Sequence, residues 1–428
     1  MSGILQGCVI DWAEQASQMA DIFSNAYLTI AASASRNGQE GLLNRRPAIR
    51  NLDAVHNDKA FLVCVRDVIR HEFDDTGYDP FGHFSTLPLR ERAWCFQEEL
   101  LSTRIIHFTN EEVVFVCRGA TTCECDPRWR PRFELPPLVG TSPAEPAELW
   151  EQVVKHYTGR GISFCRDRLP ALSSFSNIFQ EDPDRYHAGL WESHMPGSLL
   201  WWTLCGARPR QEPESQSRPP SWSWASIEGR VTYLRGLEGQ KNFAEVLHVR
   251  TYPSTVDPRG MVSGGHITIR APLFPLEGIQ KEHETPWKRI LKYNGGMYYR
   301  DYSFACSPGW ASNLQWLEKD DCCCVLDDLY EPELLLSDDV FYKPIFLLII
   351  RTFEEYDLVE NFPYPGGYKF LGLLLQPLED LDQIRAKIME GPESRIPFVR
   401  IGFGAMCLSN EAGEEALNRF KNHYVTIF

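Results

Sequence analysis

The sequence lacks long hydrophobic runs and an excess of positive charge. Its longest strongly apolar run, Ile345 to Ile350, is far shorter than the ~20 residues that a membrane-spanning helix needs. The segment from Met1 to Trp12 has neither the basic region nor the apolar core of a secretory signal. Acidic residues outnumber basic ones by 58 to 43, a net charge of −15. We therefore expect no binding to nucleic acid or to an anionic membrane, both of which attract cationic surfaces.

Cysteine is also scarce for a disulfide-stabilised protein. The chain has 13 cysteines in 428 residues, well below the content of disulfide scaffolds. The number is odd, and Cys322, Cys323 and Cys324 are consecutive, an arrangement that is hard to accommodate in disulfide geometry. We expect free thiols in a reducing compartment and therefore a soluble, cytoplasmic protein.

The length and the hydrophobic pattern predict a mixed fold of several domains. At ~100–200 residues per domain, 428 residues correspond to two or three domains, and 43% hydrophobic residues exclude wholesale disorder. The pattern favours a mixed α+β and α/β class with three regions. Residues 1–125 read as α/β, residues 126–220 as a helical and proline-rich connection, and residues 221–428 as a β-rich domain.

The first region begins with a helix and a buried strand. Asp11 can cap the helix, with Glu14 at the capping-box spacing. Tyr27 to Ser33 is apolar with little alternation, which predicts a strand covered on both faces. Leu89 to Leu101 reads as a second helix that is apolar on two sides, and short β-like runs at Arg104–Phe108 and Val113–Cys117 follow as a hairpin.

The later regions change from helix to strand. Helices are predicted from Pro146 to about Tyr157 and from Leu169 to Phe179. Strand-like runs then follow at Val231–Leu234, Ala244–Thr251, His266–Ala271, Ile345–Arg351, Lys369–Gln376, Pro397–Phe403 and His423–Phe428.

Three blocks of the N-terminal sequence are rich in rare residues and occur in a characteristic order. They are Gln6 to Ser33, Gly41 to Pro47, and Pro88 to Arg104, which contains Arg92-Ala93-Trp94-Cys95-Phe96-Gln97-Glu98. In this respect the first 120 residues resemble the HET (heterokaryon incompatibility) domain of filamentous fungi. Further segments resemble the region that follows this domain in many such proteins: Asp167–Leu172, Ala188–Trp191, Leu199–Trp201 and Pro220–Ser226.

The resemblance makes residues 1–125 a partial HET domain. The chain starts at Ile4-Leu5-Gln6 of the family pattern, so we expect the N-terminal part of the domain to be missing. The implied function is non-self recognition and regulated cell death in a filamentous fungus through protein partners. The alternatives are a TIR-like NAD-hydrolysing enzyme, by analogy with the helix-borne glutamate of TIR enzymes, and a non-functional truncated family member.

Glu98 is the candidate catalytic residue. It lies four residues beyond Trp94 on an apolar side of the predicted helix, where a carboxylate must find a partner or shift its pKa. The competing interpretation is a structural ion pair with Arg90 or Arg104, or a bond to the backbone. The full candidate motif comprises Arg90, Arg92, Trp94, Gln97, Glu98 and Arg104.

Cysteine chemistry is a weaker prediction. Cys95 and His107 suggest a nucleophile and its base, but no orienting residue is implied, so a core thiol and a strand histidine are the simpler interpretation. The spacing of Cys117, Cys123 and Cys125 around Glu124 lacks the second cysteine pair of structural zinc sites. We therefore predict no metal and no cofactor.

Trp222 and Trp224 form the second candidate site. They alternate with serine, so a strand would place both on one face. The two interpretations are an aromatic core cluster and an interaction surface for a partner protein. The net charge of −15 permits specific oligomers and leaves the oligomeric state open.

Overall fold

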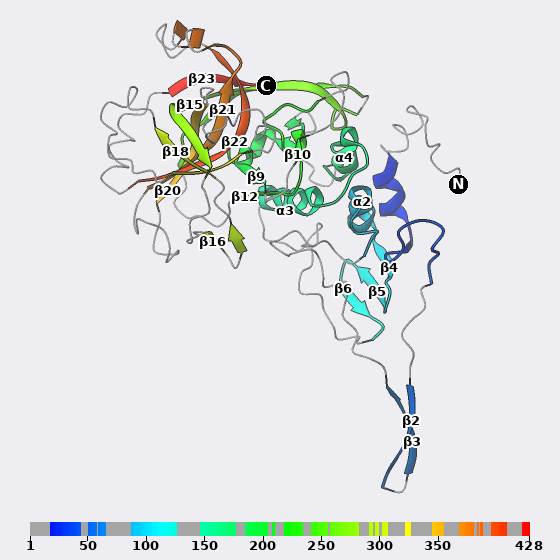
Figure 1. Cartoon of the computed structure of the whole chain (residues 1–428). Coiled ribbons are helices and arrows are strands. Elements are labelled where there is room, and N and C mark those ends of the chain that lie inside the picture. Colours follow the sequence, from blue (N-terminus) through cyan, green and yellow to red (C-terminus); the bar gives the residue numbers. More distant parts are fainter. Residues whose placement is uncertain are drawn as a thin grey trace. The chain divides into compact units, whose positions relative to one another are not determined.

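The chain divides into two compact units, one formed by residues 1–143 with 160–162 and the other by residues 144–159 with 163–428 (Figure 1). The structure is a computed structural model, and the mixed α/β class predicted from the sequence is confirmed. The three-region division stays a prediction. The structure describes residues 18–43, 50–57, 59–65, 87–125, 146–176, 185–203, 208–209, 218–233, 241–255, 257–281, 291–293, 296–298, 302–306, 322–326, 345–354, 368–380, 383–384, 386–387, 395–408 and 422–428.

The first unit contains a four-stranded sheet. Residues 18–25 are helical and precede the first strand of the sheet. Its strands lie in the order β1-β4-β5-β6, and β1 runs parallel to β4. The helix α2 lies between these two strands in sequence, so β1, α2 and β4 have the connectivity of a β-α-β crossover. The bounds are β1 Thr29–Ala31, α2 Ala93–Leu101, β4 Arg104–Phe108, β5 Val113–Cys117 and β6 Ala120–Cys123.

The first predicted strand is shorter and more exposed than expected. Of Tyr27 to Ser33, only Thr29–Ala31 is strand, and the side chains of Tyr27 and Ile30 are 83% and 60% exposed. The prediction of burial on both faces was therefore wrong for this part of the run. The physical reason is position, because β1 lies at the edge of the sheet and pairs only with β4 among the described strands.

A separate hairpin follows β1 in the sequence. Strands β2 (Arg50–His56) and β3 (Lys59–Val65) pair antiparallel along their whole length. The chain reverses at Asn57, whose φ of 50° is one that asparagine tolerates better than most residues. Most hairpin side chains are exposed, among them Leu52, Val55 and Phe61.

The second unit combines helices, short strands and a closed sheet. Its helices confirm the two predicted ones, α3 as Pro146–Thr158 and α4 as Pro170–Ser176. Among the described residues, no helix has the length and apolar character that a membrane crossing requires. The short elements are η1 Cys165–Asp167, β7 Tyr186–His187, β8 Leu190–Trp191, η4 Glu192–His194, η5 Gly197–Leu199, β9 Trp201–Thr203, β10 Arg208–Pro209, η6 Trp224–Ser226, β11 Ile227–Glu228 and β12 Val231–Tyr233.

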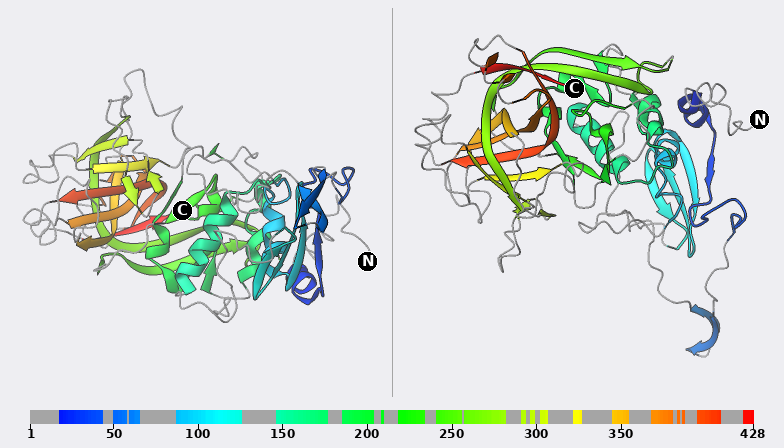
Figure 2. Two further views of the ribbon diagram at one scale, coloured as in Figure 1. Left: turned by 90° about the horizontal axis from the view of Figure 1, so that it is seen from below. Right: turned by 45° about the horizontal axis from the view of Figure 1, so that its top comes forward.

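The C-terminal strands close on themselves. Successive pairings lead from β15 through β20, β21, β22, β19 and β18 back to β15, which makes a barrel (Figure 2). Each predicted strand-like run overlaps one of the strands β12, β14, β15 or β20 to β23, so the β-rich C-terminal region is confirmed. The bounds are β13 Lys241–Asn242, β14 Glu245–Pro253, β15 Val262–Lys281, β16 Leu291–Tyr293, β17 Gly296–Tyr298, β18 Tyr302–Cys306, β19 Cys322–Leu326, β20 Ile345–Glu354, β21 Tyr368–Pro377, β22 Ile396–Leu408 and β23 Asn422–Ile427.

Trp222 and Trp224 lie in the interior of this unit, both at 0% exposure. The predicted strand is instead a turn followed by the short helix η6, whose Ser223 side chain accepts a hydrogen bond from the Ala225 N–H. The interaction surface proposed for the two side chains is therefore contradicted by their burial. Of the two interpretations, the burial of both side chains supports the aromatic core cluster.

A single backbone carbonyl organises this core. The indole N–H groups of Trp150 and Trp224 both donate to the Gly189 carbonyl, each at 2.9 Å. Trp201 donates in turn to the carbonyl of Trp222 at 3.0 Å. The segments that resemble the region after the HET domain thus meet in one packed cluster, and their rare residues are explained by packing.

Candidate functional site

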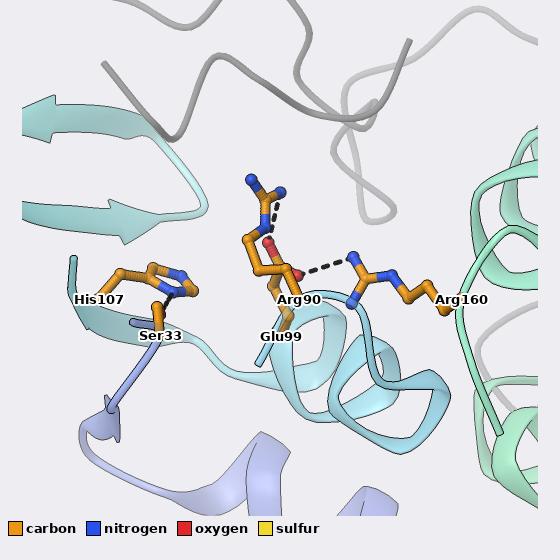
Figure 3. A network of polar contacts seen from close by, with 5 residues as sticks. All are labelled: Ser33, Arg90, Glu99, His107 and Arg160. Carbon is orange, nitrogen blue, oxygen red and sulfur yellow. Dashed lines mark hydrogen bonds and ion pairs between the residues drawn. The ribbon is translucent and has the colours of Figure 1, made fainter. Parts of the chain in front are cut away.

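A network of charged side chains in the first unit is centred on the Glu99 carboxylate of α2. Arg90 and Arg160 each donate a guanidinium N–H to a different carboxylate oxygen of Glu99, both at 3.0 Å (Figure 3). All three side chains retain only 11–13% exposure. A buried carboxylate therefore lies between two cations, one from the turn before α2 and one from a segment 61 residues further along the chain.

Backbone contacts place Arg160 beside the helix. The Gly161 N–H donates to the Glu91 carbonyl at 2.7 Å, and the Ala93 N–H donates to the Gly161 carbonyl at 2.9 Å. The guanidinium of Arg160 also lies 4.5 Å from the ring centroid of the fully buried Phe96, a cation–π geometry. These contacts explain why the helix begins at Ala93 and not at Leu89, since the preceding residues form a turn that pairs with Gly161.

The network is ionised at neutral pH. Burial alone would raise the pKa of the Glu99 carboxyl, but the charges of Arg90 and Arg160 outweigh burial and hold that pKa below its usual range. Burial lowers the pKa of Arg160, an effect that Glu99 opposes, and an arginine still remains protonated. Because no proton moves among these groups near pH 7, the network orients and stabilises the helix and does not act as an acid or a base.

His107 extends the polar region onto the sheet. It lies on β4 opposite Ala31 of β1, and its Nδ1 is 2.9 Å from the Ser33 hydroxyl (Figure 3). Burial lowers the pKa of His107 to about 4, more than the nearby Glu99 charge can raise it. The imidazole is therefore neutral at pH 7.

This pKa predicts a loss of stability in mild acid. Because the folded pKa of about 4 lies below the ~6.5 of an unfolded histidine, the unfolded state binds more protons between these values. The contribution is complete above pH ~6.5 and is lost as the pH falls toward 4, by up to about 3 kcal/mol in total. Urea unfolding of the first unit from pH 7 to 4.5 measures it.

His107→Gln should flatten this pH dependence, because glutamine can bond to Ser33 but does not titrate. His56→Gln, at an exposed position of β2, should leave the pH dependence unchanged. Equal slopes for His107→Gln and the unmodified protein would rule out His107 as the titrating group.

Glu98 lies beside this network but does not join it. Burial raises the pKa of the Glu98 carboxyl, and the positive charge of Arg92 only partly opposes this effect. The ion-pair partners expected from the sequence are used elsewhere. Arg90 binds Glu99, and Arg104 donates to the carbonyl of Tyr27 at 3.5 Å and lies over the Tyr27 ring.

The other members of the candidate motif are dispersed around α2. Arg92 is exposed at the N-cap, Trp94 is half-buried, and Gln97 is fully buried. Within the described residues, neither amide atom of Gln97 has a hydrogen-bond partner. Leaving such groups unmet costs about 1–3 kcal/mol each, which makes Gln97 a candidate ligand contact.

The cysteine–histidine hypothesis loses its chemical basis in the structure. Burial, and then the neighbouring Glu98 charge, raise the pKa of the buried Cys95 thiol to about 12. A thiol of this kind is protonated at neutral pH and is a poor nucleophile. His107 is neutral and bonded to Ser33. The simpler interpretation, a core thiol and a strand histidine, describes both residues.

The sequence did not reveal three residues of the network. Glu99 is adjacent to Glu98, and the spacing from Trp94 favoured Glu98 as the buried carboxylate of the helix. Arg160 carries no local signal, because only the tertiary fold brings it to α2. Ser33 was predicted as part of a strand and not as a side-chain partner of His107.

These features define an α/β domain with a buried ionic centre, followed in the chain by a β-barrel unit. Residues 3–98 match the family described as Heterokaryon incompatibility protein (HET). This match agrees with the resemblance of the first 120 residues to the HET domain. No curated protein and no solved structure matches the chain.

Proposed function

We propose that this chain is a heterokaryon-incompatibility-type protein that acts in non-self recognition and regulated cell death in a filamentous fungus. The observation that carries the proposal is the HET match over residues 3–98. The matched segment includes β1, most of α2 and, from the buried network, Ser33 and Arg90. In this proposal the protein works in the cytoplasm and through contacts with other proteins.

The exposed edge of the first unit supports a role in protein contacts. Strand β1 is unpaired on its outer side among the described strands, and edge strands offer backbone groups to another chain. The exposed side chains of Tyr27 and Ile30 flank this edge. Exposed apolar side chains beside an unpaired strand edge are compatible with contact to a protein partner.

Inducible expression in a filamentous fungus tests the proposal. We expect the unmodified chain to cause growth arrest and loss of viability. Ile30→Asp should weaken this effect, because a charge at the edge of β1 disfavours docking. The matched control is Leu247→Asp, at an exposed apolar position of β14 in the second unit. Full viability at the same level of folded protein would contradict the proposal.

Hydrolysis of NAD is the second candidate function. The supporting observation is the environment of Glu98, a half-buried carboxyl with a raised pKa on the helix of the HET match. Tuned carboxyl groups of this kind are typical of catalytic acids and bases.

Nicotinamide release from purified protein tests this alternative. Glu98→Gln should lower the rate by about 100-fold or more if the carboxyl is the acid or base, whereas Glu91→Gln, an exposed neighbour, should keep it. No release above the Glu98→Gln background excludes the enzyme. A folded protein that neither causes cell death nor cleaves NAD would support the third alternative, a non-functional truncated family member.

A further inference from the structure

Two thiols and a carboxylate converge at one end of the four-stranded sheet. Glu112, Cys123 and Cys125 each offer one ligand atom, and these atoms all lie within 4.8 Å of one another. The Cys123 and Cys125 sulfurs are 2.6 Å apart. The Cys125 Sγ is 3.2 Å from a carboxylate oxygen of Glu112.

The sheet geometry explains this convergence. Val114 of β5 pairs with Cys123 of β6, and the Glu124 N–H continues the ladder by donating to the Val113 carbonyl at 3.0 Å. Glu112 is therefore opposite Cys125 and diagonal to Cys123. Alternate residues of a strand point to the same face, so both sulfurs are directed to the side that Glu112 occupies.

The turn before β5 holds Glu112 in place. The Thr109 N–H and hydroxyl both bond to the Glu112 carbonyl, at 3.0 and 2.9 Å. The Glu112 N–H donates back to the Thr109 hydroxyl at 3.1 Å. A carboxylate on such a braced turn is well suited to serve as a ligand, because little conformational freedom is lost on binding.

Burial favours a cation at this position. Glu112 is 0% exposed and Cys123 is 5% exposed, and Cys123 packs with Leu87 and Val114 in an apolar cluster. Within these buried surroundings a carboxylate oxygen of Glu112 lies 3.2 Å from the Cys125 sulfur. A buried carboxylate is stable when it is paired or when it coordinates a metal ion.

We propose that Glu112, Cys123 and Cys125 form a binding site for a thiophilic divalent metal ion of the Zn²⁺ type. Two thiolates and one carboxylate make three protein ligands of a tetrahedral ion and leave a fourth position for an outside ligand. Binding would release the two thiol protons to solvent. With Zn–S bonds of ~2.3 Å, the sulfurs must separate to roughly 3.7 Å, a movement that Cys125, beyond the end of β6, can make.

This site differs from the cluster considered in the sequence analysis, which comprised Cys117, Cys123 and Cys125 around Glu124. Cys117 pairs with Ala120 across the β5–β6 turn, away from the converging sulfurs. Glu124 alternates with the two cysteines along the chain, so it points to the opposite face. The carboxylate ligand is instead Glu112, which follows the β4 strand and is brought opposite Cys125 by the hairpin.

Metal titration of the full-length reduced protein tests the proposal. The unmodified chain should bind about one more equivalent of Zn²⁺ than the double variant Cys123→Ser/Cys125→Ser. Co²⁺ as a spectroscopic probe should give a sulfur-to-cobalt charge-transfer band that the double variant lacks. Cys117→Ser is the matched control, since it removes a thiol from β5 outside the site, and it should keep both signals.

A second variant guards against misfolding of the cysteine variants. Glu112→Gln preserves the size of the side chain, and it should weaken Zn²⁺ by at least 10-fold while the cobalt–sulfur band persists. Equal metal content in the double variant and the unmodified chain would overturn the proposal. An unchanged affinity for Zn²⁺ in Glu112→Gln would also overturn the proposal. A disulfide between Cys123 and Cys125 would overturn it too, if the chain still bound no Zn²⁺ at this position after the disulfide was reduced.

Discussion

Replacing Glu99 with alanine should destabilise the first unit by about 3–5 kcal/mol, the range for breaking a buried ion pair by removing one partner. The carboxylate accepts hydrogen bonds from Arg90 and Arg160, and all three side chains are almost completely buried. Without Glu99, both guanidinium groups lose the carboxylate that accepts their hydrogen bonds. Their uncompensated desolvation is the source of the large effect.

Urea unfolding followed by hydrogen exchange of the β4 amides measures this change. The two units of the chain need not unfold together, so a local probe of the first unit is required. Glu91→Ala is the matched control, because Glu91 is exposed and contacts Gly161 only through its backbone. A loss of less than 1 kcal/mol in Glu99→Ala would show that the network contributes little to stability.

Gly189 is a position in the second unit where a single added methyl group should be strongly disruptive. A Cβ added to Gly189 would lie 2.6 Å from the Trp224 ring, and the residue has a φ of +93°. The tryptophan cannot easily withdraw, because its N–H donates to the carbonyl of Gly189 itself. We expect Gly189→Ala to lower the free energy of unfolding by about 2–5 kcal/mol, from overlap and backbone strain together.

Tryptophan fluorescence and near-UV circular dichroism follow this unit during denaturation. Gly159→Ala is the matched control in the same unit, since a Cβ there would meet only the Arg230 side chain at 3.5 Å, an ordinary contact. The control should change stability by less than about 0.5 kcal/mol. A similarly small change in Gly189→Ala would mean that the tryptophan cluster repacks freely.

Helices and strands whose sequence pattern is local were predicted correctly, whereas features that depend on distant residues were not. The helix α3 and the barrel strands β15, β20, β21 and β22 were predicted because hydrophobic periodicity within a short window specifies each of them. The barrel strands β18 and β19 were not predicted. The start of α2 was predicted too early because Gly161, far along the chain, pairs with the turn before Ala93. The burial of β1 was predicted wrongly because an apolar run does not reveal whether its strand lies at the centre or the edge of a sheet.

The candidate site shows the same division. The motif around Glu98 was found because its residues are consecutive in the chain. Its chemistry was not, because the partner of each charge depends on three-dimensional position, and Arg90 bonds to Glu99 and not to Glu98. The pairing of Cys125 with Glu112 was missed for a related reason, since it depends on the register of β5 against β6.

The sequence by itself determined the resemblance of the N-terminal part to the HET family, the acidic character of the chain and the positions of its α-helices and longest strands. These properties depend on composition, on consecutive motifs and on local periodicity. Only the tertiary structure decided that Trp222 and Trp224 are interior and that Arg160 joins the α2 network. It also decided that two cysteines face Glu112. Burial and pairing between distant residues follow from the way elements pack, and packing free energies are not encoded in any short window of sequence.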